Sequence, residues 1–312
     1  MLRAVNGKQM VVRRSLLWVS GDDIANMEER AKWGADVVTL DLEDTVKESD
    51  KPRARRVIAE VLRDMSFGDS ERWVRVNGFH TPFALDDLSV IVPAKPDAVR
   101  LPKIRTADDV RLLERLLLEI ERKENIEPGT TKVVLNIESA IAITNLFEIA
   151  KVSKRVIGMV LGGEDFTDDL QIPRPTRGLE LSMLFGRQQL IVAARAAGVQ
   201  PFDSVYLDAE DEEGLRAEAE MVRDLGMDGK NVIHPRQVKI VNEVFTPTRE
   251  QISFAYRAVQ AYDEAQRSAG KRSDGTSGVL PYVDGKFIGP PVVGKARQVL
   301  ARAEACGVAI GA

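Results

Sequence analysis

Residues 132–165 read KVVLNIESAIAITNLFEIAKVSKRVIGMVLGGED, and this stretch contains two short apolar runs that each lead into an acidic residue. The first run, Lys132–Ile137, is followed by Glu138, and the second, Val156–Leu161, is followed by Gly162-Gly163-Glu164-Asp165. Continuous apolar runs of this length are typical of strands that are buried on both faces in a parallel sheet. The stretch therefore predicts two strands of a parallel sheet with carboxylates at their C-terminal ends.

The same alternation of an apolar run with a segment of helical period occurs eight times along the chain. The other strands are predicted at Ser15–Val19, Val37–Asp41, Trp73–Val76, Ala98–Leu101, Ser204–Leu207 and Asn231–Ile233. Helical periodicity is clearest at Lys51–Met65, Ala107–Lys123, Leu179–Ala197 and Glu212–Leu225. Eight such units over about 235 residues predict an α/β fold of the TIM (β/α)8 barrel type. No Gly-x-Gly-x-x-Gly follows the first strand, so a dinucleotide-binding fold loses its main support.

Composition narrows the classes of partner. The chain has 312 residues, with 44 Lys and Arg against 48 Asp and Glu, and this near balance gives no case for a nucleic-acid partner. The apolar runs are far shorter than the roughly 20 residues that cross a bilayer, so no membrane association is expected. A single cysteine, Cys306, cannot form an internal disulfide, which favours a cytoplasmic location.

The C-terminal part of the chain departs from the strand–helix alternation. A long helical stretch, Arg249–Ala269, is followed by the Gly/Ser-rich segment Gly270–Gly278 and by a final helix near Val292–Ala305. We expect a TIM-barrel catalytic domain over residues 1–269 and a C-terminal extension over residues 270–312. Because that extension is too short to fold alone, it should pack on its own barrel or on that of a neighbouring subunit, and of these two we expect the neighbouring subunit.

Ionisable residues follow most of the predicted strands. Glu43 and Asp44 follow the second strand, Glu138 the fifth and Asp165 the sixth, while Arg75 lies on the third. Active sites of TIM barrels lie at this end of the strands, and acids that gather there repel one another unless a cation joins them. Two carboxylates, several waters and a chelating substrate make a usual Mg²⁺ site. We therefore predict Glu138 and Asp165 as metal ligands, with Glu43 and Asp44 holding the water molecules of the metal.

Other polar residues at strand ends leave alternatives open. Arg75 either grips the carboxylate of an anionic substrate or forms a salt bridge to Asp41 or Glu43. Pro102-Lys103 ends the fourth strand, Asp208 follows the seventh, and His234 follows the eighth, where it caps a helix, packs, or binds a ligand. With two histidines and one cysteine in the chain, the composition argues against a zinc site.

Eight short motifs follow one another in an order that points to a family. They are Arg14-Ser-Leu-Leu-x-Val, Asp41-Leu-Glu-Asp44 with Lys51-x-x-Ala-Arg55, Val74-Arg-Val-Asn77, Leu101-Pro-Lys103, Ile137-Glu138-Ser, Gly163-x-Asp165-Phe-x-x-Asp-Leu170, Gly229-Lys-x-x-Ile-His-Pro235-x-Gln237 and Asn242-x-x-Phe245-x-Pro247. Together they resemble the citrate lyase β-subunit-like branch of the HpcH/HpaI aldolase family, which includes malyl-CoA and citramalyl-CoA lyases. The resemblance extends over residues 13–300.

The resemblance implies a Mg²⁺-dependent homotrimer or hexamer that cleaves or forms a carbon–carbon bond beside a carbonyl. It assigns the metal to Glu138 and Asp165, the 2-oxo acid or its enolate to Arg75, and the ordering of metal-bound water to Glu43 and Asp44. The residues assigned to substrate or CoA binding are Arg14, Arg75, Gly163, Glu164 and Lys230.

One departure from the family pattern concerns proton transfer. Family lyases carry an acid/base Asp in the C-terminal segment, whereas Gly289 stands at that position in Asp284-Gly-Lys286-Phe-Ile-Gly289-Pro-Pro291. Ser20 also stands where the family commonly has a proline. The proton must then come from water oriented by Glu43 and Asp44, from a barrel acid such as Glu43, or from Asp284, although Asp284-Gly285 is typical of a tight turn.

We therefore predict a Mg²⁺-dependent carbon–carbon lyase. Its substrate would be a hydroxy-acyl-CoA such as malyl-CoA or citramalyl-CoA, or a related hydroxy acid, and it would release a 2-oxo acid or an acyl thioester. Two alternatives stay open: an acyl-CoA thioester hydrolase of the same family, and a non-catalytic regulatory protein that binds the metal and a 2-oxo acid.

Overall fold

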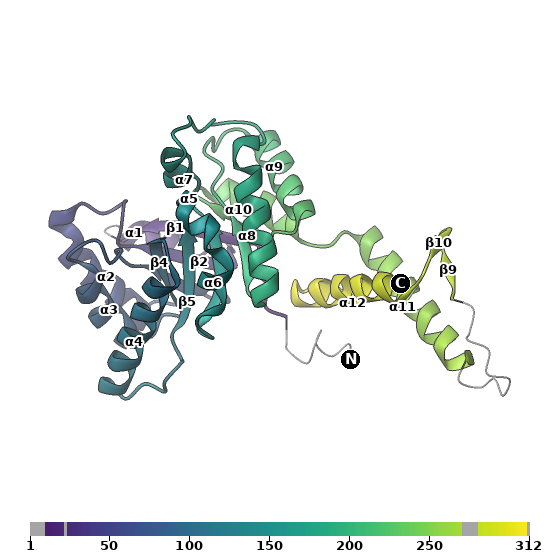
Figure 1. Cartoon of the computed structure of the whole chain (residues 1–312), viewed down its shortest axis with the longest axis horizontal. Coiled ribbons are helices and arrows are strands. Elements are labelled where there is room, and N and C mark those ends of the chain that lie inside the picture. Colours follow the sequence, from purple (N-terminus) through teal and green to yellow (C-terminus); the bar gives the residue numbers. More distant parts are fainter. Residues whose placement is uncertain (1–9, 22–23, 270–279, 311–312) are drawn as a thin grey trace. The chain divides into compact units, whose positions relative to one another are not determined.

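The computed structural model describes residues 10–21, 24–269 and 280–310 (Figure 1), and the chain divides into two compact units. Arg13–Phe245 forms the barrel unit, while the described residues 10–12 and 246–310 belong to the C-terminal unit. This division lies ahead of the helix Arg249–Ala269, whereas the predicted domain boundary lay after it. The expected linker Gly270–Gly278 lies outside the described residues.

Parallel strands of the barrel unit pair in chain order, and the last pairs with the first, which closes the sheet. The strands are β1 (Ser15–Ser20), β2 (Val37–Asp41), β3 (Glu71–Arg75), β4 (Ala98–Ile104), β5 (Lys132–Ile137), β6 (Val156–Leu161), β7 (Gln200–Asp203) and β8 (Gly229–Val232). Closure through the β8–β1 pair confirms the predicted TIM barrel.

The seventh strand begins earlier than predicted. It covers Gln200–Asp203, so the prediction of a strand at Ser204–Leu207 is wrong. Pro201 made this strand hard to predict, because proline has no N–H to donate to a neighbouring strand and is therefore rare in the middle of a sheet. Here the Pro201 carbonyl still accepts a hydrogen bond from the Asp228 N–H at 2.9 Å. Asp208 consequently lies five residues beyond the end of β7 rather than directly after it.

Helices alternate with the strands and lie around the barrel in Figure 1. The helices of the barrel unit are α1 (Ile24–Arg30), α2 (Lys51–Asp64), α3 (Ala84–Ile91), α4 (Ala107–Lys123), α5 (Ala140–Thr144), α6 (Leu146–Lys151), α7 (Gly163–Asp169), α8 (Leu184–Ala197), α9 (Glu212–Leu225) and α10 (Pro235–Phe245). Single 3-10 turns occur at η2 (Glu48–Asp50), η3 (Val92–Ala94) and η4 (Leu181–Met183). The four helices predicted most clearly correspond to α2, α4, α8 and α9, with ends that agree within a few residues.

A ring of buried apolar side chains fills the barrel toward the N-terminal ends of its strands. Its members are Leu16, Val37, Trp73, Ala98, Val134, Val160 and Phe202. Strand side chains face the same side at every second position, so the next inward positions belong to Trp18, Thr39, Arg75, Arg100 and Asn136. The barrel interior therefore changes from apolar to polar toward the C-terminal ends of the strands.

The C-terminal unit is built around α11 (Arg249–Ala269) and α12 (Pro290–Ala305), whose facing apolar side chains form a core of their own. A short antiparallel hairpin, β9 (Tyr282–Val283) and β10 (Lys286–Phe287), precedes α12. Asp284 and Gly285 form the hairpin turn with φ values of 51° and 73°, which confirms the tight turn predicted there. This left-handed pair of residues is the geometry of a type I′ hairpin turn.

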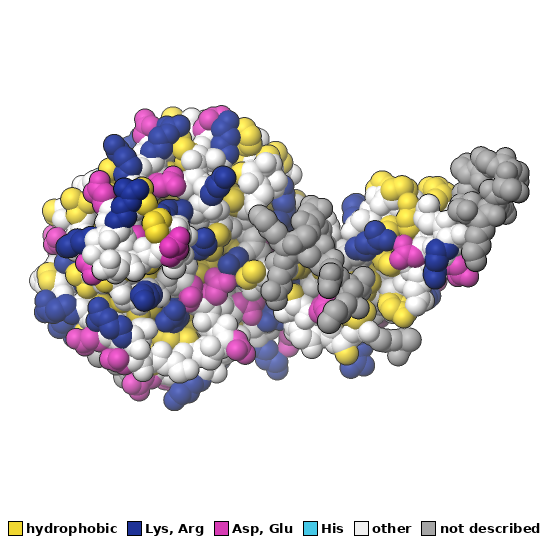
Figure 2. All heavy atoms as spheres, turned by 90° about the horizontal axis from the view of Figure 1, so that it is seen from below, with side chains coloured by type: hydrophobic (Ala, Val, Ile, Leu, Met, Phe, Trp, Pro, Cys, Tyr) yellow, Lys and Arg dark blue, Asp and Glu magenta, His cyan; other side chains and the backbone are white. Residues whose placement is uncertain are grey.

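The surface carries charges of both signs. In Figure 2, Lys and Arg side chains are interspersed with Asp and Glu across the visible face of the barrel unit. Among the described residues, no helix combines the length and the apolar character needed to span a bilayer.

Candidate active site at the C-terminal end of the barrel

Three of the predicted acids lie around the side chain of Lys103, at the C-terminal end of the barrel. Glu43 and Asp44 follow β2, and Asp165 lies in the first turn of α7, directly after β6. The Lys103 Nζ lies 3.4 Å from Glu43 Oε1 and 3.8 Å from Asp44 Oδ1. It also lies 3.7 Å from Asp165 Oδ2. One ammonium group thus joins acids from two separate strand ends.

Lys103 reaches this position through its backbone conformation. Its φ of 53° is left-handed, which costs a non-glycine residue roughly 1–2 kcal/mol, and the β4–β5 register shifts between Leu101 and Ile104. The main-chain N–H of Lys103 donates to Glu138 Oε2 at 2.7 Å. Desolvation lowers the pKa of Lys103, but the surrounding carboxylates outweigh it and raise that pKa above its ordinary value. Its position after Leu101-Pro102 at a strand end was noted in the sequence, but no role was assigned to it.

Glu138 is buried and held from two sides. Its Oε1 accepts a hydrogen bond from Asn136 Nδ2 at 2.8 Å, and its Oε2 accepts the Lys103 N–H. Gly162 packs directly against it, because a Cβ at Gly162 would lie 2.3 Å from Glu138 Cγ. Burial raises the pKa of Glu138, although Arg75 and these hydrogen bonds lower it. The absence of a side chain at Gly162 therefore leaves the space that the Glu138 side chain occupies.

Glu43 has a pKa close to neutrality. Burial raises the pKa of Glu43 to about 7, with Arg75 opposing the shift and the charge of Glu138 adding to it. The backbone beside it is fixed by Lys51, whose Nζ donates to the Leu42 carbonyl at 2.8 Å and to the Glu43 carbonyl at 2.7 Å. Glu43 is thus a positioned carboxyl that can exist in both protonation states near pH 7.

Arg75 forms the salt bridge that was one of its two alternatives. Its Nε donates to Asp41 Oδ1 at 2.6 Å and its Nη2 to Asp41 Oδ2 at 2.7 Å, and Nη1 lies 2.7 Å from Glu43 Oε2. Asp41 and Arg75 are direct partners in the β2–β3 register. Burial alone would raise the pKa of Asp41, but Arg75 more than compensates and the pKa is lowered. Nη1 also donates to Asp44 Oδ2 at 3.3 Å. A guanidinium has five N–H groups, so the contacts with Asp41, Glu43 and Asp44 leave one N–H, on Nη2, for another acceptor.

A second guanidinium lies deeper in the barrel. Arg100 is fully buried, donates to Asn136 Oδ1 at 2.5 Å and to Asn231 Oδ1 at 3.0 Å, and has no ion pair among the described side chains. Burial and the nearby charge of Arg75 lower the pKa of Arg100 to about 9. Both guanidinium groups lie over the indole of Trp18, Arg75 at 4.4 Å and Arg100 at 4.2 Å from the ring centre. Such cation–π contacts stabilise buried positive charge.

The donor set fits Mg²⁺ held by two carboxylates. In the part of the chain that the structure describes, no three Asp, Glu, His or Cys side chains form a complete metal cage. Mg²⁺ does not require one, since it commonly binds through one or two carboxylates and keeps several waters. Glu138 and Asp165 both lie against Lys103, and their oxygen donors suit this hard cation.

The charge balance of the site also favours a divalent cation. The carboxylates Asp41, Glu43, Asp44, Glu138 and Asp165 interact here with the cationic side chains Lys51, Arg75, Arg100 and Lys103. Carboxylates therefore outnumber cations in this part of the described structure, and an added cation reduces their mutual repulsion.

Two residues that were assigned to CoA binding lie apart from this acid group. Arg14 precedes β1, and its side chain binds Asp36 with Nη2–Oδ1 and Nε–Oδ2 distances of 2.7 and 2.8 Å at the N-terminal ends of the strands. Lys230 is fully buried, and its Nζ donates to Asp203 Oδ2 at 2.6 Å and to Glu218 Oε1 at 2.5 Å. Neither ammonium nor guanidinium is placed to receive a phosphate at the barrel mouth, so these two assignments are corrected.

Gly163 and Glu164 adjoin Asp165 in α7, but their polar groups are engaged within the protein. The Gly163 N–H donates to Ser204 Oγ at 3.1 Å, and Glu164 Oε1 accepts from Arg174 Nη1 at 3.0 Å. Arg174 also donates to the Val205 carbonyl at 2.6 Å, which ties the segment after α7 to the end of β7. These contacts support the position of α7.

Two other polar residues have structural partners. His234 Nδ1 accepts from the Arg236 N–H at 3.3 Å at the start of α10, which fits the helix-capping alternative. Asp208 accepts from Arg177 Nε at 2.6 Å.

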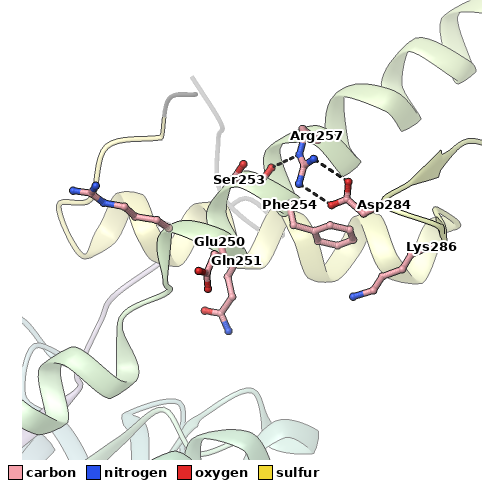
Figure 3. Close-up of a pocket in the computed structure, with 8 residues that line it drawn as sticks. Glu250, Gln251, Ser253, Phe254, Arg257, Asp284 and Lys286 are labelled. Atoms are coloured by element: carbon pink, nitrogen blue, oxygen red, sulfur yellow. Dashed lines mark hydrogen bonds and ion pairs between the residues drawn. The ribbon is translucent and has the colours of Figure 1, made fainter.

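An open pocket of about 710 Å³ lies within the C-terminal unit, along α11 and the hairpin (Figure 3). Arg257 lines it and binds Asp284 through both carboxylate oxygens, at 2.9 and 2.7 Å. Phe254 and Lys286 are neighbours in its lining, with the Lys286 ammonium 5.0 Å from the centre of the Phe254 ring. Because its carboxylate is already paired, Asp284 is a poor source of the missing proton.

Comparison with known proteins agrees with this geometry. The family model described as HpcH/HpaI aldolase/citrate lyase matches residues 14–235. The chain is 40% identical to the citrate lyase subunit beta of Escherichia coli (strain K12) over 296 residues, which cover 95% of each chain. It is 37% identical to the (3S)-malyl-CoA thioesterase of Cereibacter sphaeroides (strain KD131) over 293 residues, 94% of this chain and 95% of that one. The structure of the protein CitE from Mycobacterium tuberculosis in complex with magnesium, acetoacetate and coenzyme A has a TM-score of 0.72 and 28% identity, over 94% of this chain and 98% of that chain. The chain therefore belongs to the HpcH/HpaI aldolase/citrate lyase family.

Proposed function

We propose that this protein is a Mg²⁺-dependent carbon–carbon lyase. Its substrate would be a hydroxy-acyl-CoA such as malyl-CoA or citramalyl-CoA, or a related hydroxy acid. The observation that carries the proposal is the group of acids around Lys103, with Arg75 beside them at the mouth of the barrel. The magnesium, acetoacetate and coenzyme A bound in the related CitE structure support the ligand classes. Two of the relatives above are a citrate lyase subunit and a malyl-CoA thioesterase, which adds citryl-CoA to the substrates worth testing.

Glu138 and Asp165 are the residues that would hold the cation. When bound, Mg²⁺ supplies Lewis-acid stabilisation of the negative charge that develops on oxygen as the bond breaks. Arg75 would bind the carboxylate of the 2-oxo acid through the Nη2 N–H that Asp41, Glu43 and Asp44 leave available, and its buried setting strengthens that attraction. Its pairing with Asp41 fixes the guanidinium in advance, so less order is lost on binding.

Glu43 is the group that we propose for proton transfer, with Asp44 beside it. A hydroxyl proton must leave before the carbon–carbon bond breaks, and a carboxyl with a pKa near 7 can accept and return it near neutral pH. Lys51 holds the Glu43 backbone and so keeps the carboxyl at the mouth. Asp284 is less suited, because Arg257 binds it.

Arg75→Lys is expected to weaken the binding of pyruvate in the presence of Mg²⁺ by ten- to about a hundredfold. The ammonium keeps the charge but cannot pair with Asp41 and a ligand carboxylate at once, and a hydrogen bond to a charged group contributes about 1.5–3 kcal/mol. Calorimetric titration measures the change. Arg72→Lys on the same strand is the matched control, because the Arg72 guanidinium binds Asp97 and the carbonyls of Leu62 and Lys95 and makes no contact with the acid group. Equal pyruvate binding by the two variants would limit Arg75 to a structural role.

We also propose that the C-terminal unit packs on a neighbouring subunit in a homotrimer or hexamer. Tyr282 and Phe287 of the hairpin are 67% and 51% exposed, and their rings pack edge to face, with the centres 5.7 Å apart. Aromatic residues exposed together on a small hairpin favour burial against another surface. Light scattering of the purified chain tests this, and a monomer would contradict it.

Gly289→Asp is expected to fold normally and to leave carbon–carbon cleavage nearly unchanged, because Glu43 already supplies the proton transfer. Gly289 is the N-cap of α12 with φ −94° and ψ 175°, a position that favours Asp. Its Cβ would lie 3.2 Å from the exposed Phe287 ring and 3.8 Å from Pro291 Cδ. Gly289→Asn provides the same cap without an acid. A gain near the hundredfold of a general acid–base group, in the Asp variant alone, would show that the native chain lacks that group.

The reaction itself is tested by incubating the full chain and Mg²⁺ with malyl-CoA, citramalyl-CoA, citryl-CoA and the free hydroxy acids. Release of a 2-oxo acid without free thiol supports the lyase. Release of thiol without a 2-oxo acid supports the thioester hydrolase, the second candidate, which the similarity to malyl-CoA thioesterase favours. Binding of a 2-oxo acid with no turnover of any substrate would favour the regulatory alternative.

A further inference from the structure

Lys103 lies among the acids of the site, and the proposed function assigns no role to its ammonium group. Its ammonium lies 3.4–3.8 Å from the oxygens of Glu43, Asp44 and Asp165. Charge-assisted hydrogen bonds measure about 2.7–2.9 Å, so the ammonium is bonded closely to none of them. The summed attraction of several carboxylates, rather than one fixed bond, keeps it there.

Among the cations of the site, Lys103 is the one that can move. Its side chain is 34% exposed, whereas that of Arg75 is 9% exposed and Arg75 makes two hydrogen bonds of 2.6 and 2.7 Å to Asp41. Arg100 is fully buried and cannot leave the barrel interior. The lysine side chain is a flexible four-carbon chain, so the ammonium of Lys103 can move into solvent while its backbone stays in place.

The backbone and side chain of Lys103 have separable roles. The main-chain N–H binds Glu138 at 2.7 Å, and any amino acid except proline retains that N–H. The left-handed φ of 53° orients this N–H, and glycine adopts that φ without strain. Only the ammonium is specific to lysine, and it lies beside Asp165, one of the two proposed metal ligands.

We propose that the Lys103 ammonium is the resident counter-ion of the acid group and that a divalent cation arriving at Glu138 and Asp165 displaces it. The proposal rests on the metal site of the proposed function. The carboxylates of the site outnumber its cationic side chains, which favours an added cation, but the Lys103 ammonium competes with that cation for the carboxylate of Asp165. Lys103 therefore keeps the metal-free acid group stable at the expense of metal affinity.

The test compares Mg²⁺ affinity and thermal stability across substitutions at position 103. Lys103→Met is expected to bind Mg²⁺ about tenfold more tightly in calorimetry, because no positive charge has to be displaced. Its Tm without Mg²⁺ should be lower than that of the wild type, and its Tm gain on adding Mg²⁺ larger. Lys103→Gly should show the same gain in affinity, and it keeps the test valid if the methionine variant folds poorly. Lys103→Arg should keep an affinity near that of the wild type.

Lys95→Met is the matched control. Lys95 is an exposed lysine with a φ of 58°, but it lies before β4, at the opposite end of that strand. Lys95→Met removes one positive charge at a left-handed lysine, as Lys103→Met does, but away from the acid group. The Mg²⁺ affinity of Lys95→Met should therefore equal that of the wild type. If the wild type binds Mg²⁺ and both Lys103→Met and Lys103→Gly bind it equally or more weakly, the displacement proposal is overturned. If the wild type and Lys95→Met bind no Mg²⁺, the proposed metal site fails, and displacement fails with it.

Discussion

Glu138→Gln and Asp165→Asn are each expected to weaken Mg²⁺ binding by a hundredfold or more. Even outer-shell partners of a metal typically contribute about 10–100-fold to affinity, and each of these changes removes one of only two proposed direct ligands. Glutamine keeps the side-chain volume beside Gly162, so the loss would report charge and not packing. Calorimetry with Mg²⁺ alone measures the effect without a substrate.

Asp168→Asn serves as the control for that experiment. Asp168 is an exposed acid on the same helix as Asp165. Its substitution by asparagine removes one negative charge and leaves the proposed metal ligands unchanged. If both ligand variants bind Mg²⁺ with the affinity of the wild type, the proposed metal site is wrong. A loss confined to one of them would leave a site with a single protein carboxylate.

Gly162→Ala is expected to abolish Mg²⁺ binding nearly as completely as the loss of Glu138. The new Cβ would lie 2.3 Å from Glu138 Cγ and 2.7 Å from Glu138 Oε1, distances at which Glu138 must move. Glu138 is only 5% exposed, so its displacement disturbs packed surroundings, and we also expect a loss of about 1–3 kcal/mol in the free energy of unfolding. Chemical denaturation and calorimetry measure the two effects.

The matched substitution for this prediction is Gly294→Ala in α12. Apart from its chain neighbours and the nearby backbone of α12, no described atom lies within 4 Å of a Cβ at Gly294, so the methyl group fits and the helix gains about 0.5–1 kcal/mol from reduced backbone freedom. An alanine at position 162 that behaves like the alanine at position 294, with Mg²⁺ affinity retained, would show that Gly162 does not shape the Glu138 site.

The barrel and its acids were predictable because both follow from simple periodicities. Apolar runs marked the strands, and the rule that TIM-barrel sites lie at the C-terminal ends of strands selected Glu43 and Asp165 as candidates. The pairing of Asp41 with Arg75 was one of two open alternatives for Arg75. Choosing between them needed the β2–β3 register, which places the two residues opposite each other and which no single strand reveals.

The residues that were misplaced or missed depended on finer geometry. Lys230 and Asn231 are consecutive on β8 and must face opposite sides, so only one of them can face the barrel interior; Asn231 bonds Arg100 there, while Lys230 pairs with Glu218. Arg14 lies before β1, at the end of the barrel away from the site. The place of Lys103 beside the acids depends on its left-handed backbone conformation. Lysine has no preference for that conformation, so the sequence could not predict it.

The two guanidinium groups over Trp18 give the site a built-in optical signal. The chain has three tryptophans, and of these Trp73 is sealed within the apolar ring while Trp33 faces Arg30 in the outer part of the barrel unit. Indole emission responds to charge beside the ring, so a ligand that shifts Arg75 or Arg100 changes the fluorescence of Trp18 selectively. Subtracting the emission of Trp18→Phe isolates that signal. Rapid-mixing fluorescence can then order the arrival of cation and anion in time, with no label attached to the protein.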